Sequence, residues 1–163
     1  MKEIECYSRV RFSQNTHDDG KCLLITNEEG CYFSPTDCEG SRPRNCRPRL
    51  SIGDGCWSRG TILHELMHVL GFEHEHQRPD RNRHLKVKWG NIDRDAASQF
   101  KRLEKNEFFW DITRFPFDYY SVMLYGEYDF SRNGHKTLMS KNRRGWRDHN
   151  TLSRLDKIKV RLL

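Results

Sequence analysis

The sequence lacks any apolar run that approaches the ~20 residues needed to cross a lipid bilayer, so we expect no membrane span. It also lacks internal repeats, low-complexity tracts and a Cys-x-x-Cys pair, and the last absence disfavours a structural zinc site built from cysteines. The formal net charge of +6 would suit acidic substrates, sulfated matrix or nucleic acid. However, the basic residues are scattered and no RNA-recognition, homeodomain or zinc-finger pattern accompanies them. We therefore interpret most of them as a solvated surface and expect no nucleic-acid partner.

The last two-thirds of the chain contain no cysteine, whereas the first 56 residues contain six: Cys6, Cys22, Cys31, Cys38, Cys46 and Cys56. An even number crowded into one part of a chain predicts a disulfide framework formed in an oxidising compartment. Met1 is followed directly by charged residues, so the sequence has no signal peptide of its own. We therefore expect a secreted, extracellular protein, of which this sequence is a fragment or a processed form.

The remaining composition is that of one globular domain with a modest core. Of the 163 residues, 35% are hydrophobic and 12% are aromatic. Alternating runs predict strands at Arg9–Phe12 and Cys22–Ile25. Residues 34–49, which include Pro35 and Pro48, predict an irregular loop held by cysteines.

Three segments carry helical signals. Thr61–Leu70 has a wide apolar face, and the glycine that follows is a natural stop. A second helix is predicted near Ile92–Leu103. A third is predicted at Ser153–Leu163, where Asp156 follows Ser153 by three residues and the pair suits a helix start.

A group of histidines begins on the first of these helices, in the stretch His-Glu-Leu-Met-His-Val-Leu-Gly-Phe-Glu-His-Glu from residue 64. His64 and His68 are four residues apart, so at about 100° per residue both imidazoles leave one face, ~6 Å apart along the axis. Gly71 has no Cβ and can turn the chain sharply at the helix end, which lets His74 return as a third ligand. Glu65 lies beside the first histidine, where its carboxylate can reach a water held by the ion and act as general base.

Three neutral histidines leave one position open for water, and this open position distinguishes a catalytic zinc site from a closed structural one. Imidazoles also suit copper or nickel, so zinc is inferred from the helix-borne pattern together with Glu65. The alternative of unrelated surface histidines requires five residues at fixed offsets to coincide by chance, which is rare. The sequence therefore predicts one catalytic Zn²⁺ bound by His64, His68 and His74.

The segment His64–Arg81 resembles the long zinc signature of the astacin family of metzincin endopeptidases. A second stretch, Asp118–Gly126, is similar to the Met-turn of that family, and the resemblance extends from Cys6 to the end of the chain. It implies an α+β, metzincin-like (zincin) fold: a twisted N-terminal sheet with an active-site helix, and an irregular C-terminal half that carries the Met-turn. It also implies one peptidase domain over residues 1–163, with subdomains at about 1–74 and about 75–163.

The resemblance further implies the activity and the roles of single residues. The activity would be zinc-dependent hydrolysis of internal bonds in protein or peptide substrates, with Glu65 as general base. Met123 would form an apolar floor beneath the metal. Tyr125 would ligate zinc at rest and swing out to stabilise the oxyanion. We expect a monomer. Two alternatives stay open: a catalytically inactive zinc-binding fragment, and a basic binding module for matrix or nucleic acid.

Expectations for the cysteines and for Glu75 also come from the resemblance. It implies a disulfide between Cys31 and Cys56, while Cys38 and Cys46 could close an Arg/Pro-rich insertion. Cys6 and Cys22 are then left, either paired with each other or free, because the family partner of Cys6 would lie beyond Leu163. Glu75 would normally pair with a buried amino terminus. Because the chain starts inside the family's first helix, we expect this carboxylate to be unpaired.

Two arginines and the remaining histidines carry weaker interpretations. Arg78 and Arg81 could seat an acidic side chain of the substrate, or form salt bridges with Asp80 or another neighbour. Surface positions are expected for the histidines outside the motif, which are His17, His76, His84, His135 and His149.

Overall fold

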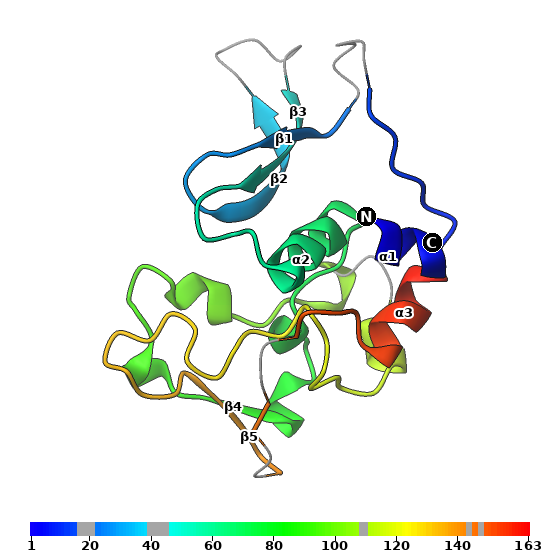
Figure 1. The fold of residues 1–163 in the computed structure, drawn as a ribbon. Coiled ribbons are helices and arrows are strands. Elements are labelled where there is room, and N and C mark those ends of the chain that lie inside the picture. The colour runs from blue at the N-terminus through cyan, green and yellow to red at the C-terminus, as the bar shows by residue number, and fades with distance from the viewer. Residues whose placement is uncertain (16–21, 39–45, 108–110, 143–144, 147–148) are drawn as a thin grey trace. The chain divides into compact units, whose positions relative to one another are not determined.

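The computed structural model describes residues 1–15, 22–38, 46–107, 111–142, 145–146 and 149–163 (Figure 1). The chain forms two compact units: Met1–Leu70 together with Asn150–Leu163, and Gly71–His149. Within the described residues, no helix is long and apolar enough to cross a membrane. The expectation of one peptidase domain that divides near residue 74 stays a prediction.

The first unit contains a three-stranded sheet of strand order β1-β3-β2. β1 (Leu24–Thr26) runs parallel to β3 (Cys46–Ile52), and β2 (Cys31–Cys38) runs antiparallel to β3. Leu50 and Ile52 project from the same face of the central strand and both are buried. The predicted strand at Cys22–Ile25 is therefore present, but it is shifted to Leu24–Thr26.

The irregular loop predicted for residues 34–49 is wrong in part, because β2 and β3 both extend into it. Pro35 and Pro48 lie where the pairing shifts its register, between the pairs Ser34↔Arg49 and Asp37↔Arg47. A proline nitrogen has no hydrogen to donate, so a strand tolerates proline at such an irregularity. The part of the predicted loop at residues 39–45 lies outside the described residues.

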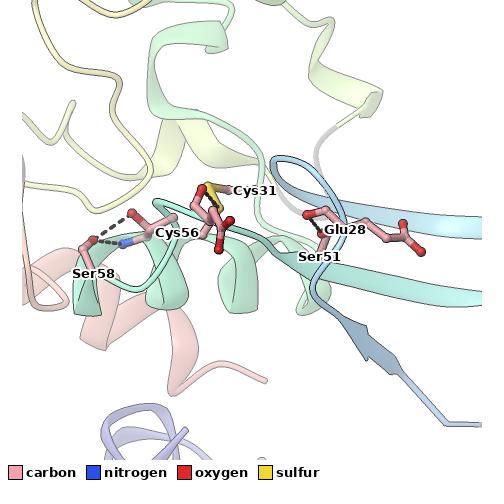
Figure 2. The surroundings of a disulfide bond; sticks show 7 residues. Glu28, Cys31, Ser51, Cys56 and Ser58 are labelled. Atoms are coloured by element: carbon pink, nitrogen blue, oxygen red, sulfur yellow. Dashed lines mark hydrogen bonds between the residues drawn. A yellow bond between two sulfur atoms is a disulfide. The ribbon is translucent and has the colours of Figure 1, made fainter.

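A disulfide between Cys31 and Cys56 joins the start of β2 to the chain that leads into the next helix (Figure 2). This pairing, implied by the family resemblance, is confirmed. Figure 2 also shows the Ser51 hydroxyl donating to the Glu28 carbonyl at 2.8 Å, which ties β3 to the turn before β2. The disulfide thus fixes the entry of the helix against the sheet.

The other cysteines behave differently. Cys6 is exposed and Cys22 is half-buried, and both are free thiols. Of the two alternatives left open for this pair, the unpaired one is therefore correct. Cys38 and Cys46 lie opposite each other in the β2–β3 register. Their side chains fall outside the described residues, so a bond between them stays a prediction.

The helix predicted at Thr61–Leu70 is confirmed as α2 (Arg59–Val69). Ser58 is its N-cap, and the Ser58 hydroxyl accepts a hydrogen bond from the Thr61 amide at 3.0 Å (Figure 2). The buried side chains on this helix include Leu63, Glu65, Leu66 and Met67.

The first unit is completed by α1 (Lys2–Tyr7), which packs against α3 (Arg154–Val160). The Tyr7 ring faces two cations, with Lys157 Nζ 4.9 Å and Arg161 Cζ 5.5 Å from its centroid. The predicted C-terminal helix is confirmed together with its start. Ser153 and Asp156 form a capping box in which each side chain accepts from the other residue's amide.

The strand predicted at Arg9–Phe12 does not form. The Phe12 amide donates to Glu5 Oε1 at 2.8 Å instead of to a neighbouring strand. Arg11 Nη1 donates to three backbone carbonyls, at distances from 2.7 to 3.3 Å. Bonds from side chains to nearby backbone groups thus replace those of a sheet.

The second unit consists mostly of short 3₁₀ helices and loops. In it β4 (Leu85–Val87) pairs antiparallel with β5 (Leu138–Ser140). The 3₁₀ helices are η2 (Glu75–Gln77), η3 (Arg81–Arg83), η4 (Trp89–Asn91), η5 (Ala97–Phe100), η6 (Lys105–Glu107) and η7 (Ile112–Arg114). Its core contains Leu85, Ile92, Ala96, Phe100, Phe117, Leu124, Leu138 and Trp146.

The helix predicted near Ile92–Leu103 is wrong, since only η5 forms within it. The Asp93 carboxylate accepts from the Asp95 amide at 3.1 Å, a local turn that competes with helix formation. The Asp93 amide donates to the Phe130 carbonyl, and the Leu103 amide donates to the Gln77 carbonyl, each at 2.8 Å. These amides are therefore committed to distant partners rather than to a helix.

Candidate metal centre

Two of the predicted ligands lie one turn apart on α2. The Nε2 atoms of His64 and His68 are 3.2 Å apart, with the two rings nearly perpendicular at 83°. This distance permits a hydrogen bond when one ring nitrogen carries the proton. It is also close to the roughly 3.4 Å that separates two ligands placed about 2.1 Å from a tetrahedral ion. The helix thus aims both nitrogens at one point, as predicted.

The third predicted ligand follows the end of the helix. Gly71 has a φ of +84°, in the left-handed region that a residue with a side chain rarely adopts. The chain therefore turns at the predicted glycine. The ligand atoms of His64, His68 and His74 all lie within 4.8 Å of one another. Among the residues that the structure describes, these three histidines are the group of at least three His, Cys, Asp or Glu side chains that could hold a metal ion.

Gln77, which the sequence analysis did not single out, orients the third histidine. Its Oε1 lies 2.9 Å from Nδ1 of His74. With the proton on Nδ1 the ring donates to this oxygen, and Nε2 is then the unprotonated nitrogen that can ligate a metal. The signal was available in the sequence, because side chains three residues apart on one helical turn are neighbours.

The donor set fits Zn²⁺. It consists of three imidazoles and no thiolate, and each ring is half-buried. Three neutral nitrogen donors hold the ion and leave a further coordination position open to water or substrate. The fit rests on these donors and their spacing.

Glu65 lies on α2 next to the first histidine, and its side chain is buried. Burial raises the pKa of this carboxyl from 4.5 to about 7 in the metal-free chain. A nearby cation would lower that pKa again, because positive charge favours the carboxylate. A group that titrates near neutral pH can both accept and release a proton.

Two further predicted residues lie close to the segment that carries the third histidine. The carbonyl of Met123, a buried residue, accepts a hydrogen bond from the Glu75 amide at 2.9 Å. The Tyr125 ring lies 4.6 Å from the His74 ring, centroid to centroid. The Tyr125 hydroxyl donates to Oε1 of Gln99 at 2.9 Å, a partner for which the sequence offered no signal. The apolar floor and the switch remain predictions.

The expectation of an unpaired Glu75 is wrong. This buried carboxylate accepts from Nη1 of Arg78 at 2.8 Å and from the Asp118 amide at 2.9 Å. Arg78 also donates Nε and Nη2 to the two oxygens of Asp80, at 2.9 and 3.0 Å. Of the two interpretations of Arg78, the salt bridge is therefore correct. A buried ion pair satisfies the carboxylate that follows the third histidine.

The histidines outside the motif are not all on the surface. His76 is fully buried and its Nε2 lies 3.0 Å from the Gln99 carbonyl, so the surface interpretation is wrong for this residue. His84 is half-buried and stacks on Phe117 at 4.7 Å, whereas His135 is exposed. His17 lies outside the described residues.

An α+β fold in which one helix presents two histidines and a glycine turn precedes a third defines the metzincin class of zinc peptidases. The sequence profile of the astacin peptidase family matches residues 1–162, and the chain belongs to this family.

Relatives and solved structures agree with this assignment. Zinc metalloproteinase nas-8 of Steinernema carpocapsae is 41% identical over 141 residues, which cover 86% of this chain and 32% of that protein. Zinc metalloproteinase nas-15 of Caenorhabditis elegans is 34% identical over 164 residues, which cover 100% of this chain and 27% of that protein. High choriolytic enzyme 1, a hatching enzyme zinc-protease from Oryzias latipes, superposes with a TM-score of 0.81 at 27% identity. That match covers 98% of this chain and 76% of the solved chain.

These matches define what kind of domain the chain is. The α+β zincin fold predicted from the sequence is confirmed. The chain is a domain of the astacin peptidase family, and its histidine triad is consistent with the catalytic zinc of that family. The chain spans about a third of the length of the first curated relatives it matches.

Proposed function

We propose that this chain carries out zinc-dependent hydrolysis of internal peptide bonds in extracellular protein or peptide substrates. The observation that carries the proposal is the convergence of His64, His68 and His74 with Glu65 on the same helix as the first two. A disulfide between Cys31 and Cys56 supports secretion into an oxidising compartment.

In this proposal each of the three histidines holds the metal through one unprotonated ring nitrogen, and Gln77 keeps His74 in the required tautomer. Zinc, when bound there, supplies a Lewis acid that polarises the scissile carbonyl and lowers the pKa of water to about 7. The role of the chain's own residues is to orient that ion and to move protons.

Glu65 accepts a proton from the attacking water and delivers it to the nitrogen of the leaving amine. Its burial supports this role, since a desolvated carboxylate is a stronger base than one in water. Tyr125 donates its hydroxyl hydrogen to the oxyanion that develops on the substrate carbonyl. That hydroxyl bonds to Gln99 in the structure, so the switch requires it to exchange this partner for the substrate.

The test compares wild type with Glu65→Gln in cleavage of a broad peptide mixture, with zinc content measured on both. We expect both proteins to bind one zinc and Glu65→Gln to lose activity by about a thousandfold, within the usual range for a general base. Glu29→Gln removes an exposed carboxylate elsewhere in the first unit and is the matched control. It should cleave like wild type.

The cleavage sites then reveal the sequence specificity. If wild type binds zinc and cleaves nothing, the chain is a catalytically inactive zinc-binding protein and the proposal fails. If wild type binds no zinc, the proposed ligand set is wrong.

A further inference from the structure

A groove in the Gly71–His149 unit has five cations in its lining. Its volume is about 750 Å³, in the range of sites that hold small ligands. Its walls come from η3, β4, η4, residues 101–104 and the residue after β5. The cations are Arg81, Lys86, Lys101, Arg102 and Lys141, and the lining also includes one carboxylate, that of Glu104. None of these cations is a predicted metal ligand.

These five cations form no ion pair with a carboxylate among the described residues. Arg102 donates Nη1 to the Pro79 carbonyl at 3.1 Å. Arg81 donates Nη1 to the His76 carbonyl at 2.7 Å and Nε to Asn82 at 3.0 Å. Within the described part of the chain, Nη2 of Arg81 has no hydrogen-bond partner. With Glu104 as the one carboxylate in its lining, the groove carries an excess of positive charge among the described residues.

A comparison of Arg78 with Arg81 shows how unusual a buried arginine without a carboxylate partner is. Both are buried, with relative exposures of 0% and 3%. Burial alone would lower the pKa of Arg78, but its bonds to Asp80 and Glu75 raise it. Burial, followed by the positive charge of Arg102, lowers the pKa of Arg81 to about 10. A buried cation without a carboxylate beside it costs stability, and an anion in the groove would lower that cost.

The groove also offers an aromatic surface. Trp89 lines it and is 51% exposed, so a large part of its indole faces solvent beside the cations. Leu85, Val87 and Leu103 add apolar lining. A sugar ring packs its C–H groups on such an indole, while its sulfate groups reach the surrounding ammonium and guanidinium groups.

We propose that this groove binds a sulfated polysaccharide, with Arg81 at its base and Trp89 as the platform for a sugar ring. A sulfate carries its charge at every physiological pH, and several sulfates on one short oligosaccharide match several cations in one groove. The disulfide Cys31–Cys56 points to an oxidising compartment, where sulfated polysaccharides rather than nucleic acids are the polyanions. This site is independent of the zinc chemistry proposed for the chain.

The test measures the affinity of a sulfated heparin hexasaccharide by titration calorimetry at several salt concentrations. The groove variant is Lys86→Gln/Lys101→Gln/Lys141→Gln, which alters exposed lysines and leaves the buried Arg81 in place. The matched control, Lys2→Gln/Arg9→Gln/Arg94→Gln, removes the same charge from exposed positions outside the groove. The same titration is repeated with the desulfated hexasaccharide, hexaglutamate and a short single-stranded oligonucleotide.

We expect the groove variant to bind the sulfated hexasaccharide at least tenfold more weakly than wild type, with a shallower salt dependence. The control should stay within threefold of wild type, and the desulfated sugar should not bind. Zinc removal should leave the affinity unchanged. Equal losses in both variants would reduce the effect to overall charge and overturn the proposal. Hexaglutamate or the oligonucleotide binding as tightly, with the same sensitivity to the groove variant, would assign the groove to another polyanion.

Discussion

At the scale of single residues, His74 is held differently from the other two histidines of the triad. α2 fixes His64 and His68, whereas His74 lies beyond the turn at Gly71 and depends on Gln77 for its orientation. Loss of such an outer partner typically lowers the metal affinity of a site by about 10- to 100-fold. Gln77 is therefore the residue at which the proposed zinc site can be weakened without removing a ligand.

We expect Gln77→Leu to lower the zinc affinity by about 10- to 100-fold, because leucine cannot accept the hydrogen bond that Gln77 Oε1 accepts from Nδ1 of His74. Competition with a chromophoric chelator measures this affinity. Gln14→Leu makes the same change at an exposed position and should bind zinc like wild type. A Gln77→Leu protein that keeps the wild-type affinity would show that the hydrogen bond does not position His74 for the metal.

Glu65 makes the stability of the metal-free protein depend on pH. Burial raises its pKa from 4.5 to about 7, so the folded state binds this proton more tightly than the unfolded state does. Ionisation of the buried Glu65 carboxyl therefore lowers the free energy of unfolding. This effect is absent below pH 4.5, grows as pH rises and is complete above about 7. It amounts to about 3 kcal/mol, since each step of one in pKa between 4.5 and about 7 corresponds to about 1.4 kcal/mol.

Glu65→Gln should therefore stabilise the chelator-treated protein by about 3 kcal/mol at pH 8 and leave its stability unchanged near pH 4. Urea unfolding at both pH values measures the two differences. Glu29→Gln, at an exposed position, should show no such pH dependence. A gain from Glu65→Gln that is the same at both pH values would come from packing rather than from the titration.

At the scale of elements, Arg78 joins the segment after His74 to a distant stretch of the chain. Its guanidinium contacts Glu75 and Asp80, and also donates to the carbonyls of Phe115 and Pro116 at 2.8 and 3.2 Å. Removing one partner of a buried ion pair leaves an uncompensated charge, which costs about 3 to 5 kcal/mol.

We expect Arg78→Met to destabilise the protein by about 3 to 5 kcal/mol, because the Glu75 carboxylate stays buried without its cation. Arg83→Met alters an exposed arginine five residues later and should change the stability by less than about 0.5 kcal/mol. The free energy of unfolding in urea compares the two variants. Similar values for both would mean that the ion pair contributes little to the fold.

The elements that the sequence predicted correctly are those whose signals are local. α2 has an apolar face and a stop glycine within its own residues, and α3 starts at a capping box. The predictions failed where partners outside the predicted segment decide its conformation. Asp93 bonds to Phe130, and Phe12 bonds to Glu5, so neither segment takes the conformation that its own pattern favours. Pro48 lies in a strand because the register shifts beside it, which a single sequence does not reveal.

The same division holds for the candidate site. The spacing of His64 and His68 follows from helix geometry, and Gly71 fixes the turn that brings the chain to His74. By contrast, the hydrogen bond from Tyr125 to Gln99 joins residues 26 positions apart, and no periodicity relates them. Arg78 was ambiguous in the sequence because substrate binding and a buried salt bridge use the same side chain.

At the scale of the whole molecule, the chain is small and its crosslink is correspondingly important. A chain of 163 residues, of which 35% are hydrophobic, can bury only a limited core, so constraints on the unfolded state add substantially to its stability. Cys31 and Cys56 are 25 residues apart, and closing a loop of this length contributes about 3 kcal/mol in the chain-entropy view.

We expect Cys31→Ala/Cys56→Ala to lower the free energy of unfolding by about 3 kcal/mol, because the unfolded chain regains the freedom that the crosslink removed. Cys6→Ala/Cys22→Ala removes two free thiols and is the matched control, with an expected change below about 1 kcal/mol. Urea unfolding followed by circular dichroism compares both with wild type, and dithiothreitol should lower wild type at least to the level of the first variant. Because the crosslink also fixes the entry of α2, the same loss should weaken zinc binding at His64 and His68. A destabilised variant with unchanged zinc affinity would show that the disulfide acts only by constraining the unfolded chain and does not position α2 for the metal.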